Sequence, residues 1–394
     1  MGNLTSSALG TCFDTDVNRT YKSGQLGFLQ TTRKSQRGVS REIARVGDHA
    51  DSTDAWGLQM ACDAAHDDYV RCLAVLPRSN LIVSGGGDSV IRVWSAETGR
   101  LLREVENDSL RVFLVREDHN ELLAGARDGS ITVYDTKSWK VKTAFMDDSG
   151  SVFALAEHHY TLISGSDHIA IWTNPEWRPA TDPTPGHTGM MEGRPSMGRE
   201  VIRGQRGAPL PWGGVWRASH VIDEASRSLM VHDGKLYVGA IDRALKVYDL
   251  KTLECIETLV HHERCIWSML VVNQFLVTGS ADFTLGVWRF AKEDGEPALQ
   301  LVASLGDHSG WIVQLLSYGN KLVTACLDGF VRVWDTHGDP VDWRRVKVIE
   351  VSENEENEVY SVAAIDNKLV TASSDGAIHV YFDARQQHEQ RQSQ

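Results

Sequence analysis

The segment LVTACLDGFVRVWD, residues 322–335, decides the fold of this chain of 394 residues. An apolar run ends in a short turn at Asp328, and a run of alternating residues then leads to the pair Trp334–Asp335. Aspartate favours tight turns because its carboxylate accepts hydrogen bonds from nearby backbone N–H groups. Alternation with a period of two places successive side chains on opposite faces of a strand. The segment therefore predicts a β-hairpin with buried side chains on both faces.

The same pattern occurs seven times along the chain. The other copies are LIVSGGGDSVIRVW (81–94), LLAGARDGSITVYD (122–135), LISGSDHIAIW (162–172), LYVGAIDRALKVYD (236–249), LVTGSADFTLGVW (276–288) and LVTASSDGAIHVYF (369–382). The seven turn aspartates are Asp88, Asp128, Asp167, Asp242, Asp282, Asp328 and Asp375, separated by 40, 39, 75, 40, 46 and 47 residues. A period near 40 residues with four short strands is typical of a propeller blade. The interval of 75 residues holds one period and an insertion of about 35 residues.

These seven copies resemble the WD40 repeat family over about residues 57–383. The Trp-Asp pair of that family is present at Trp334–Asp335, and the other copies end in a Tyr-Asp pair or in an aromatic residue without Asp. The resemblance implies an all-β fold, a seven-bladed WD40 β-propeller with a flexible N-terminal arm and a long insertion after the third blade. We expect the propeller to span residues 55–383, with the insertion at about residues 173–220.

The last blade lacks a candidate for its outer strand. After residue 383 the sequence is polar and rich in glutamine, so residues 384–394 are expected to form a tail. We expect about residues 57–63, which precede the first complete blade, to supply the missing strand and close the circle. Closure removes the open sheet edges that favour aggregation.

The insertion is rich in residues that disfavour regular sheet. It holds seven of the ten prolines of the chain and the tryptophans Trp177, Trp212 and Trp216. Proline removes backbone donors, and a loop this long is usually functional or disordered. We expect the tryptophans of PWGGVW (211–216) to hold that segment against the propeller or a partner.

The WD40 resemblance also implies a hydrogen-bonded chain within a blade, from a His before the first strand through a Ser or Thr and the turn Asp to the Trp. Three copies hold the full set: His66, Ser84, Asp88 and Trp94; His262, Thr278, Asp282 and Trp288; His308, Thr324, Asp328 and Trp334. A Ser–His–Asp set also occurs in hydrolases, but a catalytic triad needs a single activated nucleophile beside an oxyanion hole. Because the set recurs at the repeat spacing, we interpret it as structural and expect no catalytic residue.

Composition excludes several other classes of protein. The net charge of -13 argues against non-specific binding of nucleic acid, and no apolar run is long enough for a transmembrane helix. The first residues lack the apolar core of a secretory signal, and none of the six cysteines forms a C-x-x-C pair. The pairs His158–His159 and His261–His262 lack a third ligand at suitable spacing, and no nucleotide-binding motif occurs. We therefore expect a cytoplasmic protein without a metal, a cofactor or a small-molecule substrate.

Residues 1–54 show no strand or helix period and are expected to form a disordered basic arm. They begin MGNLTSSALG, which matches the M-G-x-x-x-[ST] pattern for N-myristoylation of Gly2. One acyl chain binds membranes only marginally, so stable anchoring needs a second signal. Arg33, Lys34, Arg37 and Arg41 are candidates to contact an anionic membrane surface. The alternative is an unmodified flexible arm.

Partner-binding residues follow from an alignment of the copies, whose first strands are expected to open at Val70, Val112, Val152, Ser226, Ile266, Ile312 and Val359. In WD40 proteins the residues beside this position, and the residue before the turn Asp, lie on the narrow rim around a central channel. Here the chosen positions hold Tyr69, Arg71, Arg111, Phe113, Arg127, Phe153, Arg227, Trp267, Trp311, Leu327 and Tyr360. Aromatic residues and arginines are typical of interface hot spots, and clustered arginines favour acidic or phosphorylated peptides. The alternative is that Phe113, Phe153 and Trp267 fill the core beside the channel.

The resemblance implies a platform for other proteins rather than an enzyme. We expect a non-catalytic scaffold or adaptor, held at the cytoplasmic face of a membrane by peripheral association through Gly2 and the basic arm. The alternative is a soluble subunit that recruits substrates to a larger complex such as a ubiquitin ligase. Fold alone does not choose between them.

Overall fold

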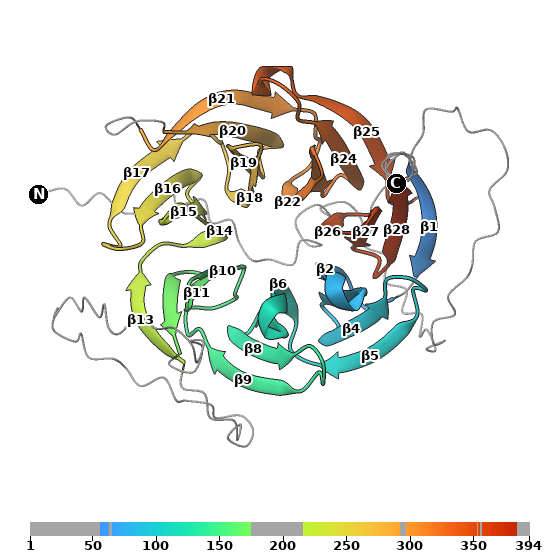
Figure 1. Ribbon diagram of the computed structural model, residues 1–394. Helices are drawn as coiled ribbons and strands as arrows, with labels where there is room; N and C mark the ends of the chain where they lie inside the picture. Colours follow the sequence, from blue (N-terminus) through green and yellow to red (C-terminus); the bar gives the residue numbers. More distant parts are fainter. Residues whose placement is uncertain are drawn as a thin grey trace, which may run out of the picture. The chain divides into compact units, whose positions relative to one another are not determined.

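The computed structural model describes residues 56–62, 65–174, 216–291, 297–352, 354 and 357–383. The predictions for Gly2, for the arginines and lysine of the basic arm and for the tail 384–394 lie outside the described residues. The described part forms seven four-stranded sheets, each antiparallel between neighbouring strands, arranged around a central channel (Figure 1). The predicted seven-bladed β-propeller is confirmed.

The first three blades lie N-terminal to the insertion or contain it. Blade one consists of β2 (Val70–Leu76), β3 (Leu81–Gly86), β4 (Val90–Ser95) and β5 (Leu101–Glu106). Blade two consists of β6 (Leu110–Arg116), β7 (Glu121–Ala126), β8 (Ser130–Asp135) and β9 (Val141–Met146). Blade three consists of β10 (Ala154–His158), β11 (Thr161–Gly165), β12 (Ile169–Thr173) and β13 (Arg217–Ile222).

The remaining blades complete the circle. Blade four consists of β14 (Ser226–His232), β15 (Lys235–Ala240), β16 (Ala244–Asp249) and β17 (Cys255–Val260). Blade five consists of β18 (Ile266–Val272), β19 (Phe275–Ser280), β20 (Thr284–Phe290) and β21 (Leu299–Gly306). Blade six consists of β22 (Ile312–Tyr318), β23 (Lys321–Cys326), β24 (Phe330–Asp335) and β25 (Arg344–Glu350). Blade seven consists of β26 (Val359–Ile365), β27 (Lys368–Ser373), β28 (Ile378–Asp383) and β1 (Trp56–Cys62). The described residues also form three short 3₁₀ helices, η1 (Pro77–Ser79), η2 (Glu117–His119) and η4 (Pro340–Asp342).

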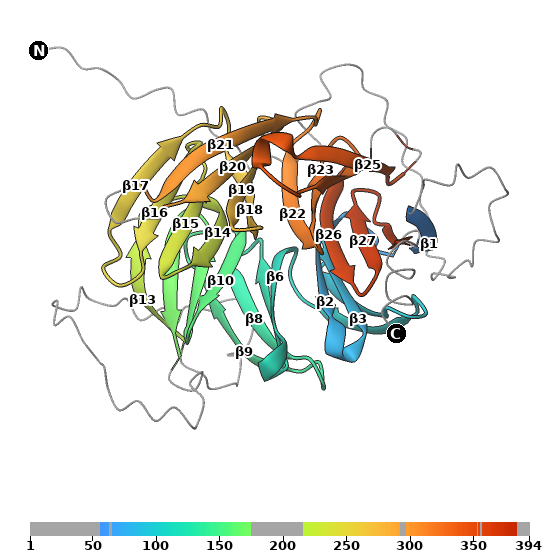
Figure 2. The same ribbon diagram turned by 45° about the horizontal axis from the view of Figure 1, so that its top comes forward.

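The first strand of each blade lies nearest the channel, and the fourth strand lies at the perimeter (Figure 1). In the tilted view of Figure 2, β14, β18 and β22 stand next to one another around the channel. Neighbouring sheets pack face to face through apolar side chains. Val83 and Ile91 of blade one, for example, share a cluster with Leu110 and Leu122 of blade two, and all four are fully buried. Each such side chain contributes about 1.5–3 kcal/mol by leaving water.

The circle closes where the sequence predicted. β1 pairs with β28 from Trp56 opposite Asp383 to Cys62 opposite Ile378, so the strand begins one residue earlier than expected. The Trp56 ring also lies 5.3 Å, centroid to centroid, from the ring of Tyr318 in blade six. One strand from the start of the described chain therefore completes the sheet made by its last three strands.

The insertion differs from the prediction at its C-terminal end. Residues 217–220 were expected within it, but they belong to β13, which pairs with β12 as the outer strand of blade three. The inserted residues therefore lie inside the blade, between its third and fourth strands. β13 is almost wholly exposed, so its residues lack the alternation that marks a half-buried strand. Its pairing depends on the backbone edge that β12 offers, which is a tertiary feature.

Trp216, the last residue of PWGGVW, packs against the propeller. It is buried, and its ring stacks on Phe145 of β9 with 4.8 Å between centroids. Phe145 also contacts Trp172 of β12, so three aromatic rings join blades two and three beside the insertion. The expected attachment to the propeller is present for this tryptophan, whereas Trp177 and Trp212 lie outside the described residues.

The alignment of the second copy was wrong by two residues. Leu110, not Val112, is the residue that opens the first strand of blade two, because Leu110 pairs with Ala126 as Val70 pairs with Gly86 in blade one. In blades one and two the first hairpin connection contains a 3₁₀ helix, η1 or η2, and is longer than the two-residue turn of blade five. Counting back from the turn Asp ignores this extra length. Phe113 consequently lies deeper in the channel than predicted.

Candidate functional site

A ring of seven side chains surrounds the mouth of the channel, one from each blade. These residues, which we call the collar, are Arg71, Arg111, Phe153, Arg227, Trp267, Val313 and Tyr360. In every blade except the third, the collar residue is the extra residue of a β-bulge at the start of the first strand, for example between Val70 and Cys72. A bulge leaves its residue out of the ladder and re-aims the side chain. The repeated bulge explains why these side chains turn towards the channel.

A small residue on the second strand makes room beside each bulge. The partner of the residue that follows the collar position is Gly in blades one to five and Ala in blades six and seven. A Cβ atom on Gly279 would lie 2.8 Å from the Ile312 Cγ2 atom of the next blade. The small residue therefore lets neighbouring blades approach closely at the level of the collar.

The arginines of the collar lie against its aromatic rings. The Arg227 guanidinium carbon is 3.7 Å from the centroid of the Phe153 ring and 5.7 Å from that of Trp267. The Arg71 guanidinium is 4.8 Å from the ring of Tyr360 and 5.5 Å from that of Trp267. Because Trp267 of blade five meets arginines from blades one and four, the side chains reach across the mouth of the channel. Cation–π contacts of this kind are worth about 0.5–2 kcal/mol.

Two further predicted residues extend this aromatic surface outwards. Trp311 stacks on Trp267 with 5.8 Å between ring centroids, and Tyr69 meets Tyr360 edge to face at 5.8 Å. Arg111 lies 5.7 Å from the ring of Phe153. The structure thus brings eight of the eleven predicted partner-binding residues together at the mouth.

The other three predicted positions lie beside or below the mouth. Arg127 is exposed on the turn between β7 and β8, and Leu327 is half-buried on the equivalent turn of blade six. Phe113 packs partly into the core between blades one and two, as the alternative interpretation expected for it. The alignment error in the second copy explains why Phe113 was predicted at the mouth although it lies below it.

Arg71 is the collar residue whose charge is least neutralised among the described contacts. Burial, and then the charge of Arg111, lower the pKa of the Arg71 guanidinium. Tyr360 donates a hydrogen bond to the Glu358 carboxylate at 2.5 Å, and burial raises the pKa of both groups. Among the residues that the structure describes, Arg71 makes no ion pair with a carboxylate. An anion at the mouth would therefore meet desolvated positive charge.

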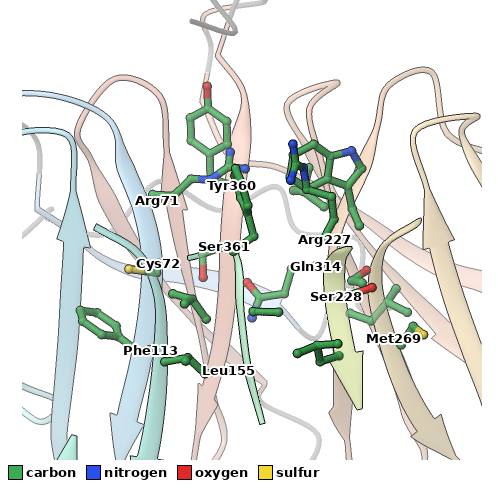
Figure 3. Close-up of a pocket in the computed structure, with 18 of the residues that line it drawn as sticks. Arg71, Cys72, Phe113, Leu155, Arg227, Ser228, Met269, Gln314, Tyr360 and Ser361 are labelled. Carbon is green, nitrogen blue, oxygen red and sulfur yellow. The ribbon is translucent and has the colours of Figure 1, made fainter. Parts of the chain in front are cut away.

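The collar and the two levels of side chains below it line a cavity of about 320 Å³. Figure 3 shows Arg71, Tyr360 and Arg227 above a polar level with Cys72, Ser228, Gln314 and Ser361, and apolar side chains beneath. The apolar level consists of Leu73, Phe113, Leu155, Leu229, Met269 and Leu315. Sequence reasoning missed both lower levels and the collar residue Val313. In the sequence, the only signal for these residues is that each lies a fixed number of positions after the residue that opens its first strand.

The polar level joins neighbouring blades. Ser361 Oγ accepts a hydrogen bond from the Leu73 backbone N–H at 3.0 Å, which links blades seven and one. Gln314 Oε1 accepts from the Val362 backbone N–H at 2.8 Å, which links blades six and seven. These side chains stabilise the circle at the level just below the collar, and so help to hold the collar residues in place.

The predicted hydrogen-bonded chain is complete in blades one and five. In blade one, Trp94 Nε1 donates to Ser84 Oγ at 2.8 Å, His66 Nε2 lies 2.7 Å from the same oxygen, and His66 Nδ1 lies 2.9 Å from Asp88 Oδ1. Arg92 adds a bond to the Asp88 carboxylate. Burial opposes ionisation of Asp88, but the bonds from His66 and Arg92 outweigh it and lower the pKa of Asp88.

Blade five has the same geometry without the arginine. Trp288 Nε1 donates to Thr278 Oγ1 at 3.0 Å, and His262 bridges Thr278 at 2.7 Å and Asp282 at 2.9 Å. Ser84, Thr278 and Thr324 are each fully buried, so none of these hydroxyls faces solvent or substrate. This burial favours the structural interpretation of all three sets.

In blade six one link of the predicted chain is absent. His308 Nε2 lies 2.8 Å from Thr324 Oγ1, and Trp334 Nε1 donates to that oxygen at 3.5 Å. No hydrogen bond joins His308 to Asp328, whose carboxylate instead accepts bonds from Arg332 and from the Ser309 backbone N–H, both at 3.0 Å. Here Arg332 supplies the donor that a histidine supplies in the other two sets.

Two features are absent from the part of the chain that the structure describes. No three His, Cys, Asp or Glu side chains form a group that could hold a metal ion. Nor does any helix reach the length and hydropathy needed to span a membrane.

A family model for the WD domain, G-beta repeat, matches residues 59–95, 253–289 and 299–335. Each match ends one residue after the tryptophan of its copy, at Ser95, Arg289 and Asp335. The chain therefore contains WD40 repeats, and the resemblance seen in the sequence is confirmed. Propellers built from these repeats generally serve as platforms for other proteins rather than as enzymes.

Similar proteins match only over part of this chain. The WD repeat-containing protein pop2 of Schizosaccharomyces pombe is 24% identical over 138 residues, 27% of this chain and 20% of pop2. The DENN domain and WD repeat-containing protein SCD1 of Arabidopsis thaliana is 23% identical over 150 residues, 38% of this chain and 12% of SCD1. The ribosome biogenesis protein BOP1 homolog of Drosophila melanogaster is 38% identical over 45 residues, 11% of this chain and 6% of that protein. The matches span at most a fifth of these relatives.

Proposed function

We propose that this protein is a non-catalytic scaffold that binds acidic or phosphorylated segments of other proteins at the collar. We propose further that N-myristoylated Gly2, with Arg33, Lys34, Arg37 and Arg41, tethers it to the cytoplasmic face of a membrane. The observation that carries the first proposal is the gathering of Arg71, Arg111 and Arg227 among aromatic rings at one end of the channel.

Physical chemistry supports an anionic ligand. Arg71 is desolvated and repelled by Arg111, so an anion that contacts both would relieve a cost already present in the free protein. Guanidinium groups bind carboxylate and phosphate through paired hydrogen bonds, and their contacts with rings restrict their rotamers before binding. Arginine, tryptophan and tyrosine are also the residues most enriched among interface hot spots.

A direct test uses an alanine-rich peptide with one central phosphoserine and its unphosphorylated form as fluorescent probes. The phosphorylated probe should bind wild type, and the double variant Arg71→Gln, Arg111→Gln should bind it at least tenfold more weakly, the size of a hot-spot loss. Arg243→Gln, on an exposed turn of the same face outside the collar, is the matched control. Equal affinity of wild type and the collar variant, with equal melting temperatures, would exclude the collar as the docking site.

The membrane proposal has its own experiment. Gly2→Ala should move the protein from the membrane fraction to the cytosol, and neutralising Arg33, Lys34, Arg37 and Arg41 should weaken salt-sensitive binding to phosphatidylserine vesicles. Unchanged fractionation of Gly2→Ala would favour the alternative, a soluble subunit that recruits substrates to a larger complex such as a ubiquitin ligase.

A further inference from the structure

Exposed carboxylates lie beside the collar on the same face of the propeller. They lie in the loops that lead into the first strands, and we call them the acidic ring: Asp67, Asp68, Asp108, Asp148 and Glu263. These loops serve blades one, two, three and five. Because each first strand begins at the channel mouth with its collar residue, the loops before those strands open around the same mouth.

The acidic ring keeps its charge available. Asp68 and Asp108 accept hydrogen bonds only from the next backbone N–H, at 2.8 Å and 2.6 Å, and no described cation pairs with any member of the ring. Some other acids of this face are paired, such as Asp242 with Lys246 at 3.0 Å and Asp307 with Arg345 at 2.6 Å. Arg127, Arg243 and Arg264 are also exposed on this face, but the five carboxylates of the acidic ring outnumber them. The acidic ring therefore leaves a band of net negative charge outside a positive centre.

This concentric pattern discriminates among phosphorylated segments. A ligand with acidic residues on both sides of its phosphate would place like charges over the acidic ring, whereas a basic flank would meet opposite charges there. Building on the proposed function, we propose that the collar and the acidic ring together select a phosphoserine or phosphothreonine flanked by lysine or arginine in a partner protein.

The depth of the site favours a short side chain. The arginines lie at the mouth, and the wall below them is neutral and then apolar, with Leu73, Leu155 and Met269 at its lower level. A phosphotyrosine that entered the channel would carry its phosphate past the guanidinium groups into these surroundings, where a buried dianion is costly. Phosphoserine or phosphothreonine places the phosphate at the collar while its backbone and flanking residues remain at the level of the loops.

The experiment compares three fluorescent peptides that share a central phosphoserine and differ only in flanks of lysine and arginine, of alanine, or of glutamate. Two or three exposed ion pairs should make the basic-flanked peptide bind about tenfold more tightly than the alanine-flanked one at low salt. That advantage should shrink at high salt, because exposed charges are screened. The glutamate-flanked peptide should bind most weakly.

Two triple variants locate the effect. Asp67→Asn, Asp68→Asn, Asp108→Asn should remove most of the preference for basic flanks without weakening the affinity for the alanine-flanked peptide, whose phosphate the lost carboxylates repelled. The control Glu97→Gln, Asp118→Asn, Glu254→Gln removes three exposed acids from loops that open on the opposite face, and should keep the preference.

The outcomes separate the two proposals. If the alanine-flanked and basic-flanked phosphopeptides bind equally, or if the glutamate flank is preferred, the inference about the acidic ring is wrong while the collar remains a phosphate site. A preference for basic flanks that survives the acidic-ring variant also overturns it. If no phosphopeptide binds wild type at all, the proposed function fails together with this inference.

Discussion

At the scale of single residues, one buried hydroxyl joins three elements of each complete blade. Thr278 and Thr324 hold the same position in blades five and six, but the Trp334 bond to Thr324 is longer, at 3.5 Å, than the Trp288 bond to Thr278, at 3.0 Å. Blade six also lacks the link from its histidine to its aspartate. The two blades therefore provide an internal comparison of the same hydrogen-bonded chain with and without that link.

Thr278→Val should destabilise the propeller more than Thr324→Val. Valine keeps the shape of threonine but leaves the Trp288 and His262 ring nitrogens unpaired in a buried site, which costs about 1–3 kcal/mol for each group. Denaturant unfolding of the two variants measures the difference. Equal losses of unfolding free energy would show that the complete hydrogen-bonded chain of blade five stabilises the protein no more than the incomplete one of blade six.

His308 should make stability depend on pH. Burial, followed by the charge of Arg332, lowers the pKa of His308 to about 3, and the ordinary pKa of histidine, near 6.5, applies to the unfolded chain. The unfolded state therefore binds the proton first as the pH falls. The stability from neutral His308 is complete above pH 6.5 and is lost as the pH falls from there through the folded-state pKa.

His308→Gln should reduce this acid sensitivity. Melting temperatures measured between pH 6.5 and 4.5 isolate the histidine, because Asp328, whose pKa is lowered to about 2, loses its contribution only below the ordinary aspartate range. The variant should show a shallower slope than wild type. Parallel slopes for His308→Gln and wild type would contradict the assignment.

At the scale of elements, the β-bulge of the first strand shapes the candidate site, and β13 marks where the sequence pattern fails. An outer strand needs only backbone hydrogen bonds on one edge, so the sequence of β13 shows no alternation of apolar and polar residues. The contact that fixes its start is the stack of Trp216 on Phe145. Blade three therefore depends on one tryptophan at the end of a long insertion.

Trp216→Ala should cost about 3–5 kcal/mol of unfolding free energy, the usual range for loss of a large buried aromatic side chain. Trp216→Phe, which preserves the stack on Phe145, should cost clearly less. Deleting residues 180–208, which removes no described strand, should leave the melting temperature near that of wild type. Thermal unfolding of the three proteins tests the prediction, and a large drop after the deletion alone would assign a structural role to the insertion.

At the scale of the whole molecule, stability depends on closing the circle with β1. This strand covers the edge of β28, and Trp56 reaches blade six through Tyr318. Closed circles of blades have no long open edge, and so they avoid edge-to-edge aggregation.

Removal of residues 1–62 should open the circle at blade seven, whereas removal of residues 1–54 should not. The protein without residues 1–62 should lose its cooperative melting transition and form larger species in size-exclusion chromatography. The reason is that the edge of β28 is then unpaired and can pair with other chains. The protein without residues 1–54, which keeps β1, should melt like wild type. A monomeric, cooperative protein without β1 would show that closure is dispensable.

By itself, the sequence determined the number of blades, the hairpin in each and the strand that closes the circle. It did so because apolar alternation and turn aspartates are local signals that repeat at one period. It also indicated the type of residue at the channel mouth. Tertiary structure alone decided which side chains share a level of the channel. The 3₁₀ helix in the first hairpin of blade two, for example, lengthens that connection, so Phe113 lies below the mouth and not at it. It also decided that β13 belongs to blade three and that exposed carboxylates from four blades lie near the arginines. These features depend on pairings and loop positions between residues far apart in the chain, which no local pattern encodes.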